Sequence, residues 1–231
     1  MSRYRHIFFD LDHTLWDFRT NSRTVLGELV RDHGLIERGV PDALAFIEAY
    51  EETNLRLWRR YEEGRMHRDV LRVLRFRDTL HQFDVRDDAL ADVLGHEYLE
   101  RSPRQTALMP GSLELIRDLR PHYSLHIITN GFHGVQETKL KASGLVEHFK
   151  VILTSERAQA RKPDVRIFHR ALKEAGAVAQ ESLMVGDDVR TDMAGARNAG
   201  WDHVHFAAEH DPDPLATFSV CSMAELRAVL L

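Results

Sequence analysis

Two kinds of hydrophobic spacing divide the chain into different regions. Short apolar runs bounded by polar residues occur near the start of the chain and again from about residue 124 onward. Between residues 18 and 104 the apolar positions recur three and four apart instead, as in Val25, Leu26, Leu29 and Val30. Short runs are typical of buried strands, and the wider spacing is typical of amphipathic helices. The pattern therefore predicts a sheet at both ends of the chain and a helical segment between them.

The middle segment is expected to hold four helices and no strand. Thr20 or Asn21 is suited to cap the first helix, and Pro41 to open the second. The second helix carries three aromatic residues on neighbouring turns, namely Tyr50, Trp58 and Tyr61. Aromatic residues at this spacing are expected to form the core of the helical segment. Stacking of their rings on a substrate is the alternative.

After residue 104 the expected elements alternate. Strands are predicted at 124–129, 151–153, 183–185 and 204–206, and helices at 113–119, 135–143, 167–175, 191–199 and 223–231. Asp164 is suited to cap the third of these helices. Alternation of this kind predicts a parallel sheet with helices on both faces, which the first strand, 7–9, joins.

The expected fold is therefore α/β, with a helical insertion directly after the first strand. We expect one domain from residues 1–17 and 104–231, and a helical domain from residues 18–103. An insertion at this point is expected to act as a lid or cap over the site. The alternative is a helical domain that only packs against one side.

The composition limits the classes of partner and cofactor that the protein is expected to bind. The chain has 231 residues, 43% of them hydrophobic, and a net charge of −5, which argues against a nucleic-acid or membrane-surface role. Cys221 is the single cysteine, so a cysteine-based zinc cluster is excluded. We expect a cytoplasmic protein without a signal peptide or a membrane span. His203 and His205 are expected to lie on a solvated face of a strand rather than to bind metal.

Two acids follow the first apolar run. Asp10 and Asp12 come directly after Ile7, Phe8 and Phe9. Alternate residues of a strand project to the same side, so the two carboxylates are expected to start close together at a strand end. The ends of parallel strands are where α/β sheets bind ligands. A solvated turn at the exit of the strand is the alternative for this segment taken alone.

Three further polar segments are expected at the same edge of the sheet. They are Thr129-Asn130-Gly131, Arg161-Lys162-Pro163-Asp164 and Gly186-Asp187-Asp188 with Asp192. The first offers hydroxyl and amide donors, and the second places a lysine beside a helix N-terminus, where an anion is favoured. Ordinary turns and helix caps explain each of the first two segments equally well. They do not easily explain three acids within six residues behind an apolar strand.

Together these residues predict phosphoryl transfer. Two carboxylates about 5 Å apart repel each other by roughly 3 kcal/mol at an effective dielectric constant of about 20. A gathering of Asp10, Asp12, Asp187 and Asp192 therefore needs a cation, and oxygen ligands favour Mg²⁺, with Mn²⁺ as a possible substitute. Asp10 is expected to attack phosphorus, and Asp12 to act as general acid and then general base. Lys162, Thr129 and Asn130 are expected to bind the phosphate oxygens.

With these motifs the chain resembles the haloacid dehalogenase superfamily of phosphohydrolases over nearly its whole length. Asp10-Leu11-Asp12-His13-Thr14 resembles the first motif of that family, Thr129 the second, Lys162 the third, and Gly186-Asp187-Asp188 with Asp192 the fourth. The resemblance implies a Rossmann-like core with a helical cap. It also implies a metal held by the Asp10 side chain, the Asp12 backbone carbonyl and Asp187. Asp192 and Asp188 would then support these ligands, although many relatives have serine at the position of Asp188.

The segment from Phe9 to Phe18 is similar to the YjjG-type pyrimidine 5′-nucleotidases, which hydrolyse nucleoside 5′-monophosphates. The expected partner is a small phosphorylated metabolite, such as a pyrimidine or noncanonical nucleotide, and the oligomeric state is left open. The alternative substrates are a sugar phosphate and phosphoglycolate. A metal-independent 2-haloacid dehalogenase is disfavoured because such relatives lack an acid at the position of Asp12. A non-catalytic binding module is disfavoured because Asp10 and Lys162 are both present.

Overall fold

The computed structural model describes residues 3–208 and 211–231, which form two compact units. The sheet unit comprises the chain up to Phe18 and from Gln105 onward, and the helical unit comprises Arg19–Arg104. The predicted boundaries differ from this division by one residue. Each unit is described below by itself.

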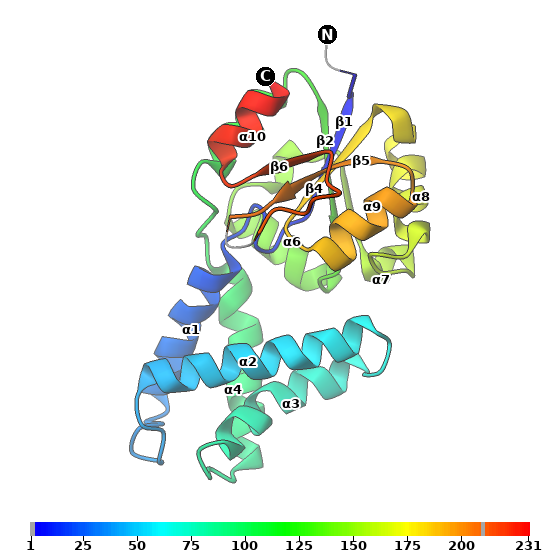
Figure 1. Cartoon of the computed structure of the whole chain (residues 1–231). Coiled ribbons are helices and arrows are strands. Elements are labelled where there is room, and N and C mark those ends of the chain that lie inside the picture. Colours follow the sequence, from blue (N-terminus) through cyan, green and yellow to red (C-terminus); the bar gives the residue numbers. More distant parts are fainter. Residues whose placement is uncertain (1–2, 209–210) are drawn as a thin grey trace. The chain divides into compact units, whose positions relative to one another are not determined.

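A six-stranded sheet forms the centre of the sheet unit (Figure 1). Its strands are β1 (His6–Phe9), β2 (Ser124–Thr129), β3 (Val151–Thr154), β4 (Ser182–Gly186), β5 (Asp202–Phe206) and β6 (Phe218–Val220). They lie in the order β3-β2-β1-β4-β5-β6, and every neighbouring pair is parallel. This confirms the predicted parallel sheet. The strand β6 was not predicted, because only Val220 of its three residues is buried and no apolar run marks it.

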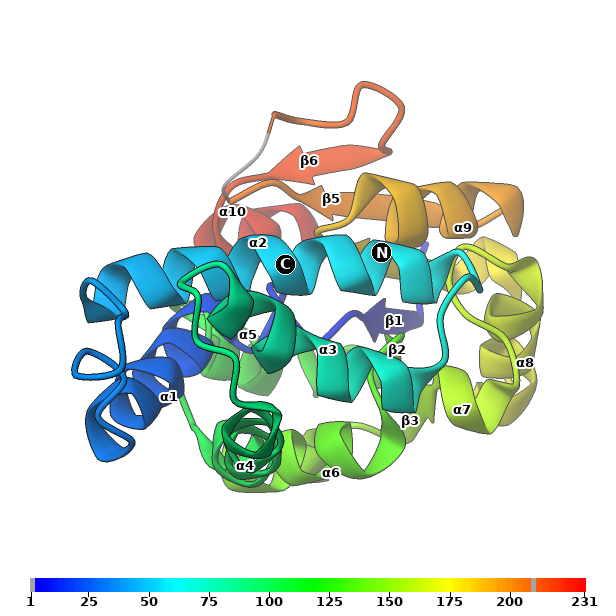
Figure 2. The ribbon, with the colours of Figure 1, turned by 90° about the horizontal axis from the view of Figure 1, so that it is seen from below.

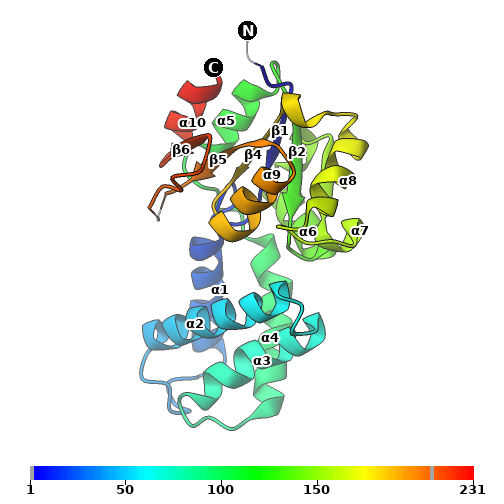
Figure 3. The ribbon, with the colours of Figure 1, turned by 45° about the vertical axis from the view of Figure 1, so that its right-hand side comes forward.

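Helices cover both faces of the sheet, as predicted. Ile7 and Phe9 face one core, to which α5 (Ser112–Leu119), α6 (His133–Ala142) and α10 (Met223–Leu230) contribute. Phe8, between them in sequence, faces a second core with α8 (Val165–Ala175) and α9 (Ala194–Asn198). Figure 3 shows α5 and α10 on one side of the sheet and α8 on the other. Because side chains alternate along a strand, β1 is buried on both faces and reads as one continuous apolar run.

Short elements complete the sheet unit. They are α7 (Ser155–Ala158) and the 3₁₀ turns Val146–His148 and Ala179–Glu181. The helix predicted at 191–199 is in fact a π-helical turn, Val189–Met193, followed by α9. Asp164 caps α8 as predicted, since its side chain accepts a hydrogen bond from the Arg166 backbone N–H. A π-helical turn inside a helix often marks a functional position, and this one carries Asp192.

The helical unit contains the four expected helices (Figure 2). They are α1 (Phe18–Asp32), α2 (Ala43–Glu62), α3 (Arg68–His81) and α4 (Asp88–Arg101), followed by a 3₁₀ turn at Ser102–Arg104. Tyr50 and Tyr61 are buried in this unit, as the expected core role requires, whereas Trp58 is only half-buried. The predicted cap at Thr20 or Asn21 is wrong, because α1 already begins at Phe18.

Among the residues described, no helix combines the length and the apolar character that a membrane span requires.

The chain runs from β1 to β2 and β3 on one side, and then returns to β4 on the other side of β1. The order of the strands therefore reverses at β1. In open parallel sheets, a crevice for ligands forms at the carboxyl ends of the strands that flank such a reversal. The residues after β1 and β4 are Asp10 and Asp187, so the topology brings the two acidic segments to the same place.

A buried histidine makes the stability of the sheet unit dependent on pH. His126 in β2 stacks on Phe8 at 4.5 Å between ring centroids, and its Nε2 lies 3.1 Å from Nδ1 of His6. Burial, with smaller contributions from His6 and Lys150, lowers the pKa of His126 to about 3. Since this value lies below that of an unfolded histidine, the unfolded chain binds a proton between about pH 6.5 and pH 3 that the folded chain does not.

We therefore expect the free energy of unfolding to fall by about 1 to 2 kcal/mol between pH 7 and pH 5 through this one residue. Replacing His126 with phenylalanine should remove that part of the loss, because Phe cannot bind a proton. Urea unfolding of the wild type and His126→Phe at both pH values measures the difference. His122→Phe, at an exposed position, serves as the control. Equal losses in the wild type and His126→Phe would contradict the assignment.

Candidate active site

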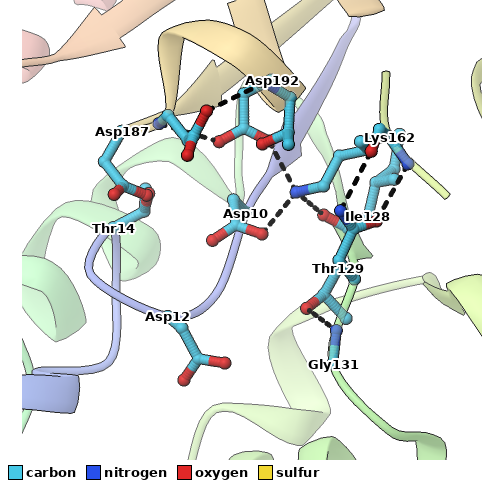
Figure 4. Close-up of polar contacts among 12 residues, drawn as sticks. Asp10, Asp12, Thr14, Ile128, Thr129, Gly131, Lys162, Asp187 and Asp192 are labelled. Atoms are coloured by element: carbon cyan, nitrogen blue, oxygen red, sulfur yellow. Dashed lines mark hydrogen bonds and ion pairs between the residues drawn. The ribbon is translucent and has the colours of Figure 1, made fainter. Parts of the chain in front are cut away.

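The carboxyl ends of three adjacent strands and one loop supply the polar groups of the site. Asp10 follows β1, Thr129 ends β2, Asp187 follows β4, and Lys162 lies in the loop between α7 and α8. Figure 4 shows the ammonium group of Lys162 directed at Asp10 and Asp192, with Asp187 and Thr129 on either side of Asp10. This gathering was expected from the positions of the four motifs along the alternating pattern.

Lys162 is the centre of the cluster. Its ammonium group lies 2.5 Å from Oδ1 of Asp10 and 2.5 Å from Oδ1 of Asp192, and it donates to the backbone carbonyl of Ile128 at 2.9 Å. The side chains of Lys162 and Asp192 are almost completely buried, with 2% and 1% exposed. Two hydrogen bonds and one ion-pair contact therefore surround the ammonium group. They hold it in place without help from solvent.

The carboxylates of the cluster are under electrostatic strain. Burial raises the pKa of Asp10 to about 7, with Lys162 lowering it and Asp192 raising it further. Burial, together with Asp10 and Asp192, raises the pKa of Asp187 well above its usual range. Burial alone would lower the pKa of Lys162, but Asp10 and Asp192 raise it above its ordinary value. One ammonium therefore faces three carboxylates, and negative charge remains in excess.

Thr14 and His205, for which no role beside Asp187 was predicted, hold Asp187 in place. The hydroxyl of Thr14 donates to its Oδ1 at 3.1 Å. The backbone N–H of Asp213 donates to Nδ1 of His205, so Nε2 of the same ring carries the proton and donates to the Asp187 carbonyl at 3.0 Å. His203 and His205 are both buried, so the expectation of a solvated face is wrong. In a parallel sheet covered on both sides, neither face of β5 meets solvent.

Asp188 shapes the backbone of the fourth segment. Its Oδ1 accepts from the backbone N–H groups of Arg190 and Thr191 at 2.7 and 2.9 Å, which caps the π-helical turn. The backbone N–H of Asp188 itself donates to Oδ2 of Asp192 at 3.2 Å. A Cβ added to Gly186 would lie 2.4 Å from that oxygen, so only glycine leaves room for Asp192 here. Asp188 thus supports Asp192 through the backbone.

Thr129 and Asn130 have different tasks. The Thr129 oxygen accepts from the Gly131 N–H at 3.1 Å and from Nε2 of Gln136 at 2.7 Å, which leaves its own proton to be donated. The Asn130 amide is instead engaged with the backbone of Lys162. Its Oδ1 accepts from the Lys162 N–H, and its Nδ2 donates to the Lys162 carbonyl. The side chain of Asn130 therefore positions Lys162, a role that was not predicted, and its expected contact with a phosphate stays a prediction.

The Asp12 carboxylate does not join the other acids. Its Oδ1 lies 2.5 Å from Nζ of Lys139, and its Oδ2 accepts from Nε2 of Gln136 at 2.8 Å. Figure 4 shows it directed away from Asp187 and Asp192. Burial opposes ionisation, but Lys139 and Gln136 outweigh it and hold the pKa of Asp12 below its usual range. The expected convergence of Asp12 with the other three acids is therefore wrong for its side chain, because β1 ends at Phe9 and strand alternation no longer applies.

The acidic cluster has the size of a site for a small divalent cation. Asp10, Asp187 and Asp192 each offer one carboxylate oxygen, and these oxygens all lie within 4.8 Å of one another. Oxygens on one Mg²⁺ lie about 2.9 Å apart when adjacent and about 4.1 Å apart when opposite, given bonds of roughly 2.05 Å. The all-oxygen donor set and the excess negative charge suit a hard cation. The residues present therefore fit Mg²⁺ or Mn²⁺.

Gln136 and Lys139 were not predicted, although a signal for them exists. They lie three positions apart on α6, and residues at this spacing share one face of a helix. Both side chains are buried despite being polar. A polar pair on the buried face of the helix that follows Thr129 indicates that these side chains have a polar partner inside the sheet unit. Thr14 lies inside the first motif, and its contact with Asp187 was not predicted.

Comparisons with known proteins identify the family of the chain. A family model for haloacid dehalogenase-like hydrolases matches residues 4–200. Pyrimidine 5′-nucleotidase PynA of Streptococcus pneumoniae is 31% identical, over 90% of this chain and 85% of that protein. Pyrimidine 5′-nucleotidase YjjG of Escherichia coli is 30% identical, over 97% of this chain and 96% of that protein.

A solved structure extends the comparison to the fold. The HAD-hydrolase YfnB of Bacillus subtilis, whose crystal structure was determined with bound magnesium, superposes with a TM-score of 0.89 at 29% identity. The superposition covers 99% of each chain. The family model covers most of this chain and includes Asp10, Thr129, Lys162 and Asp187. The chain therefore belongs to the haloacid dehalogenase-like hydrolases.

Proposed function

We propose that this protein is a Mg²⁺-dependent phosphomonoesterase that works through an aspartyl-phosphate on Asp10 and acts on nucleoside 5′-monophosphates. The observation that carries the proposal is the placement of Lys162, whose ammonium group bridges Asp10 and Asp192 beside Asp187. A buried carboxylate, a fixed cation and a cluster of acids are the parts that phosphoryl transfer requires, since catalysis there consists of positioning and charge neutralisation.

The metal would be held by the carboxylates of Asp10 and Asp187, with the Asp12 backbone carbonyl as a third ligand. When bound, the ion neutralises charge on the phosphoryl oxygens and keeps Asp10 ionised. Asp192 has a different task, since it holds Lys162 and accepts from the Asp188 backbone N–H. This division follows from burial: Asp187 remains partly exposed, whereas Asp192 is closed off.

The first chemical step forms a bond between Asp10 Oδ and phosphorus while the bond from phosphorus to the ester oxygen breaks. Lys162 and the free hydroxyl proton of Thr129 bind the phosphoryl oxygens. The departing oxygen takes a proton from Asp12. In the second step water attacks phosphorus, Asp12 takes the proton from that water, and the bond between phosphorus and Asp10 breaks.

Asp12 needs both protonation states in this cycle. Lys139 and Gln136 hold its pKa low, so it is a carboxylate before substrate arrives. A bound phosphate ester brings negative charge next to Asp12, and a nearby like charge raises the pKa of a carboxyl group. We therefore expect Asp12 to take up its proton together with the substrate. The carboxylate form left after the first step is the base that the second step needs.

The substrate class rests on the two nucleotidase relatives. The phosphate-binding residues proposed in the sheet unit bind the transferred group, so they do not by themselves distinguish one alcohol from another. The presence of Asp12 favours a phosphatase over a dehalogenase, which has no leaving alcohol to protonate.

The test is phosphate release from a panel of esters with Mg²⁺, compared by kcat/KM. We expect uridine, cytidine and thymidine 5′-monophosphates to exceed sugar phosphates and phosphoglycolate by at least about 10-fold. A preference for a sugar phosphate or phosphoglycolate would contradict the proposed substrate class but not the proposed phosphatase chemistry. Absence of phosphate release from every ester, including p-nitrophenyl phosphate, would contradict the chemistry. Halide release from 2-chloropropionate would indicate a dehalogenase instead.

A further inference from the structure

We propose that Lys139 and Gln136 of α6 are positioning residues that aim the Asp12 carboxylate at the leaving oxygen of the ester. The inference rests on the proposed function, in which Asp12 is the proton donor. It adds two residues that are not among those proposed to bind the phosphate or the ion. Their main effect is therefore expected on proton delivery rather than on phosphate binding.

Both oxygens of Asp12 are held from the same helix. Lys139 Nζ is 2.5 Å from Oδ1, and Gln136 Nε2 is 2.8 Å from Oδ2. Two contacts on the two oxygens fix the plane of a carboxylate, whereas a single contact leaves it free to rotate. A group that transfers a proton must be held in one orientation, since small displacements cost rate. The pair thus does more than neutralise Asp12.

The surroundings of Lys139 keep its ammonium group on Asp12. The residue is 3% exposed, and its Nζ lies 4.2 Å from the centre of the Trp16 ring and 5.4 Å from that of Phe18. Within residues 3–208 and 211–231, Asp12 is the acid found in ion-pair contact with this lysine. Aromatic faces attract the cation without accepting its protons in a conventional hydrogen bond. The ammonium group is therefore directed to one carboxylate.

Gln136 joins the proton donor to the phosphate site. Its Nε2 donates to Asp12 and also to Thr129, the residue whose hydroxyl proton is left for a phosphoryl oxygen. Its Oε1 is buried without a partner, which is a cost that packing alone does not explain. A Cβ on residue 131 would lie 2.1 Å from Nε2, so Gly131 is required for Gln136 to occupy this place. The close approach of Gln136 therefore explains why residue 131 is a glycine.

The experiment compares two esters that differ in their need for a proton. The departing oxygen of uridine 5′-monophosphate, or of the preferred alkyl phosphate from the panel, must be protonated, whereas 2,4-dinitrophenolate leaves as an anion. The ratio kcat/KM reports the reaction up to the first irreversible step, here transfer to Asp10, for both esters. Variants are Lys139→Met, Lys139→Arg, Gln136→Leu and Asp12→Asn. Lys141→Met is the matched control, because Lys141 lies on the same helix and pairs with Glu137 at the surface.

We expect Lys139→Met to lower kcat/KM for the alkyl ester by about 10- to 100-fold and for 2,4-dinitrophenyl phosphate by less than about 3-fold, as for loss of general acid catalysis. Gln136→Leu should show the same pattern more weakly, and Lys139→Arg should restore part of the loss. The double variant Asp12→Asn with Lys139→Met should be no worse than Asp12→Asn alone, because the lysine acts through Asp12. The control should behave as the wild type.

The outcomes separate the inference from the function on which it rests. Equal losses for both esters in Lys139→Met and Gln136→Leu, with Asp12→Asn selective for the alkyl ester, would overturn the inference alone. If Asp12→Asn also lost equal activity toward both esters, Asp12 would not be the proton donor, and the inference would fail together with that assignment. If Lys139→Met does not fold, as judged by circular dichroism, Lys139→Arg and Gln136→Leu decide by the same ratio.

Discussion

Replacing Asp10 with asparagine is expected to lower kcat by roughly 10⁴-fold or more while the fold is kept, because the amide cannot attack phosphorus. Asparagine has nearly the same shape as aspartate and still accepts a hydrogen bond from Lys162. Asp192 remains as the second partner of that lysine. Removing one of three neighbouring acids also relieves repulsion, so the melting temperature of the metal-free variant should not fall.

Phosphate release in the steady state measures the loss, and acid quenching during turnover tests its cause. Wild-type protein should then carry a phosphoryl group on the peptide that contains Asp10, detectable by mass spectrometry, and the variant should not. Asp118→Asn, which alters a surface acid paired with Arg227, is the control and should remain active. Full activity of Asp10→Asn in a preparation free of contaminating phosphatase would show that another group attacks phosphorus.

Replacing Asp187 with asparagine is expected to have opposite effects on stability and on activity. In a chelator, the Asp187 carboxyl group lies beside Asp10 and Asp192, and burial together with repulsion by these two acids raises its pKa well above the usual range. A neutral amide removes that repulsion and can still accept from Thr14. We expect the metal-free variant to be more stable than the metal-free wild type by about 1 to 3 kcal/mol.

Magnesium should reverse the order of stability of the wild type and Asp187→Asn. An ion bound only by the folded state stabilises it by about 2.7 kcal/mol at a concentration of 100 times its dissociation constant. The wild type should gain this, and Asp187→Asn should gain much less and lose at least about 100-fold in kcat. Thermal unfolding in chelator and over a range of Mg²⁺ concentrations gives the stabilisation of each protein, and phosphate release gives kcat. Asp118→Asn is again the control. Equal stabilisation of both proteins by Mg²⁺ would mean that Asp187 does not hold the ion.

The elements of the sheet unit were largely predictable because each has a local cause. Strand β1 is a run of apolar residues that needs cover on both faces, and α8 starts where Asp164 can cap it. The failures have local causes as well. Strand β6 lacks an apolar run, and the start of α1 at Phe18 is two residues before the polar residues expected to cap it.

The composition of the cluster was predictable in part. Acids that follow β1 and β4 meet because parallel strands end at one edge, so Asp10, Asp187 and Lys162 could be grouped from their positions along the chain. Asn130 could not be assigned in this way. Whether an amide faces a phosphate or a neighbouring backbone depends on the path of the loop that carries Lys162, and that path is set by packing.

The residue types of the site, their order and their places at strand ends are written in the sequence, because burial of short apolar runs is a local property that forces the polar residues to the ends. The partner of each polar group was decided only by the tertiary structure. Asp12 follows Asp10 by two positions, yet its carboxylate belongs to Lys139 and Gln136 of α6 and not to the acidic cluster. Ion pairs form between groups that folding brings within a few ångströms of each other. The local sequence around Asp12 does not indicate which face of a distant helix will pack beside it.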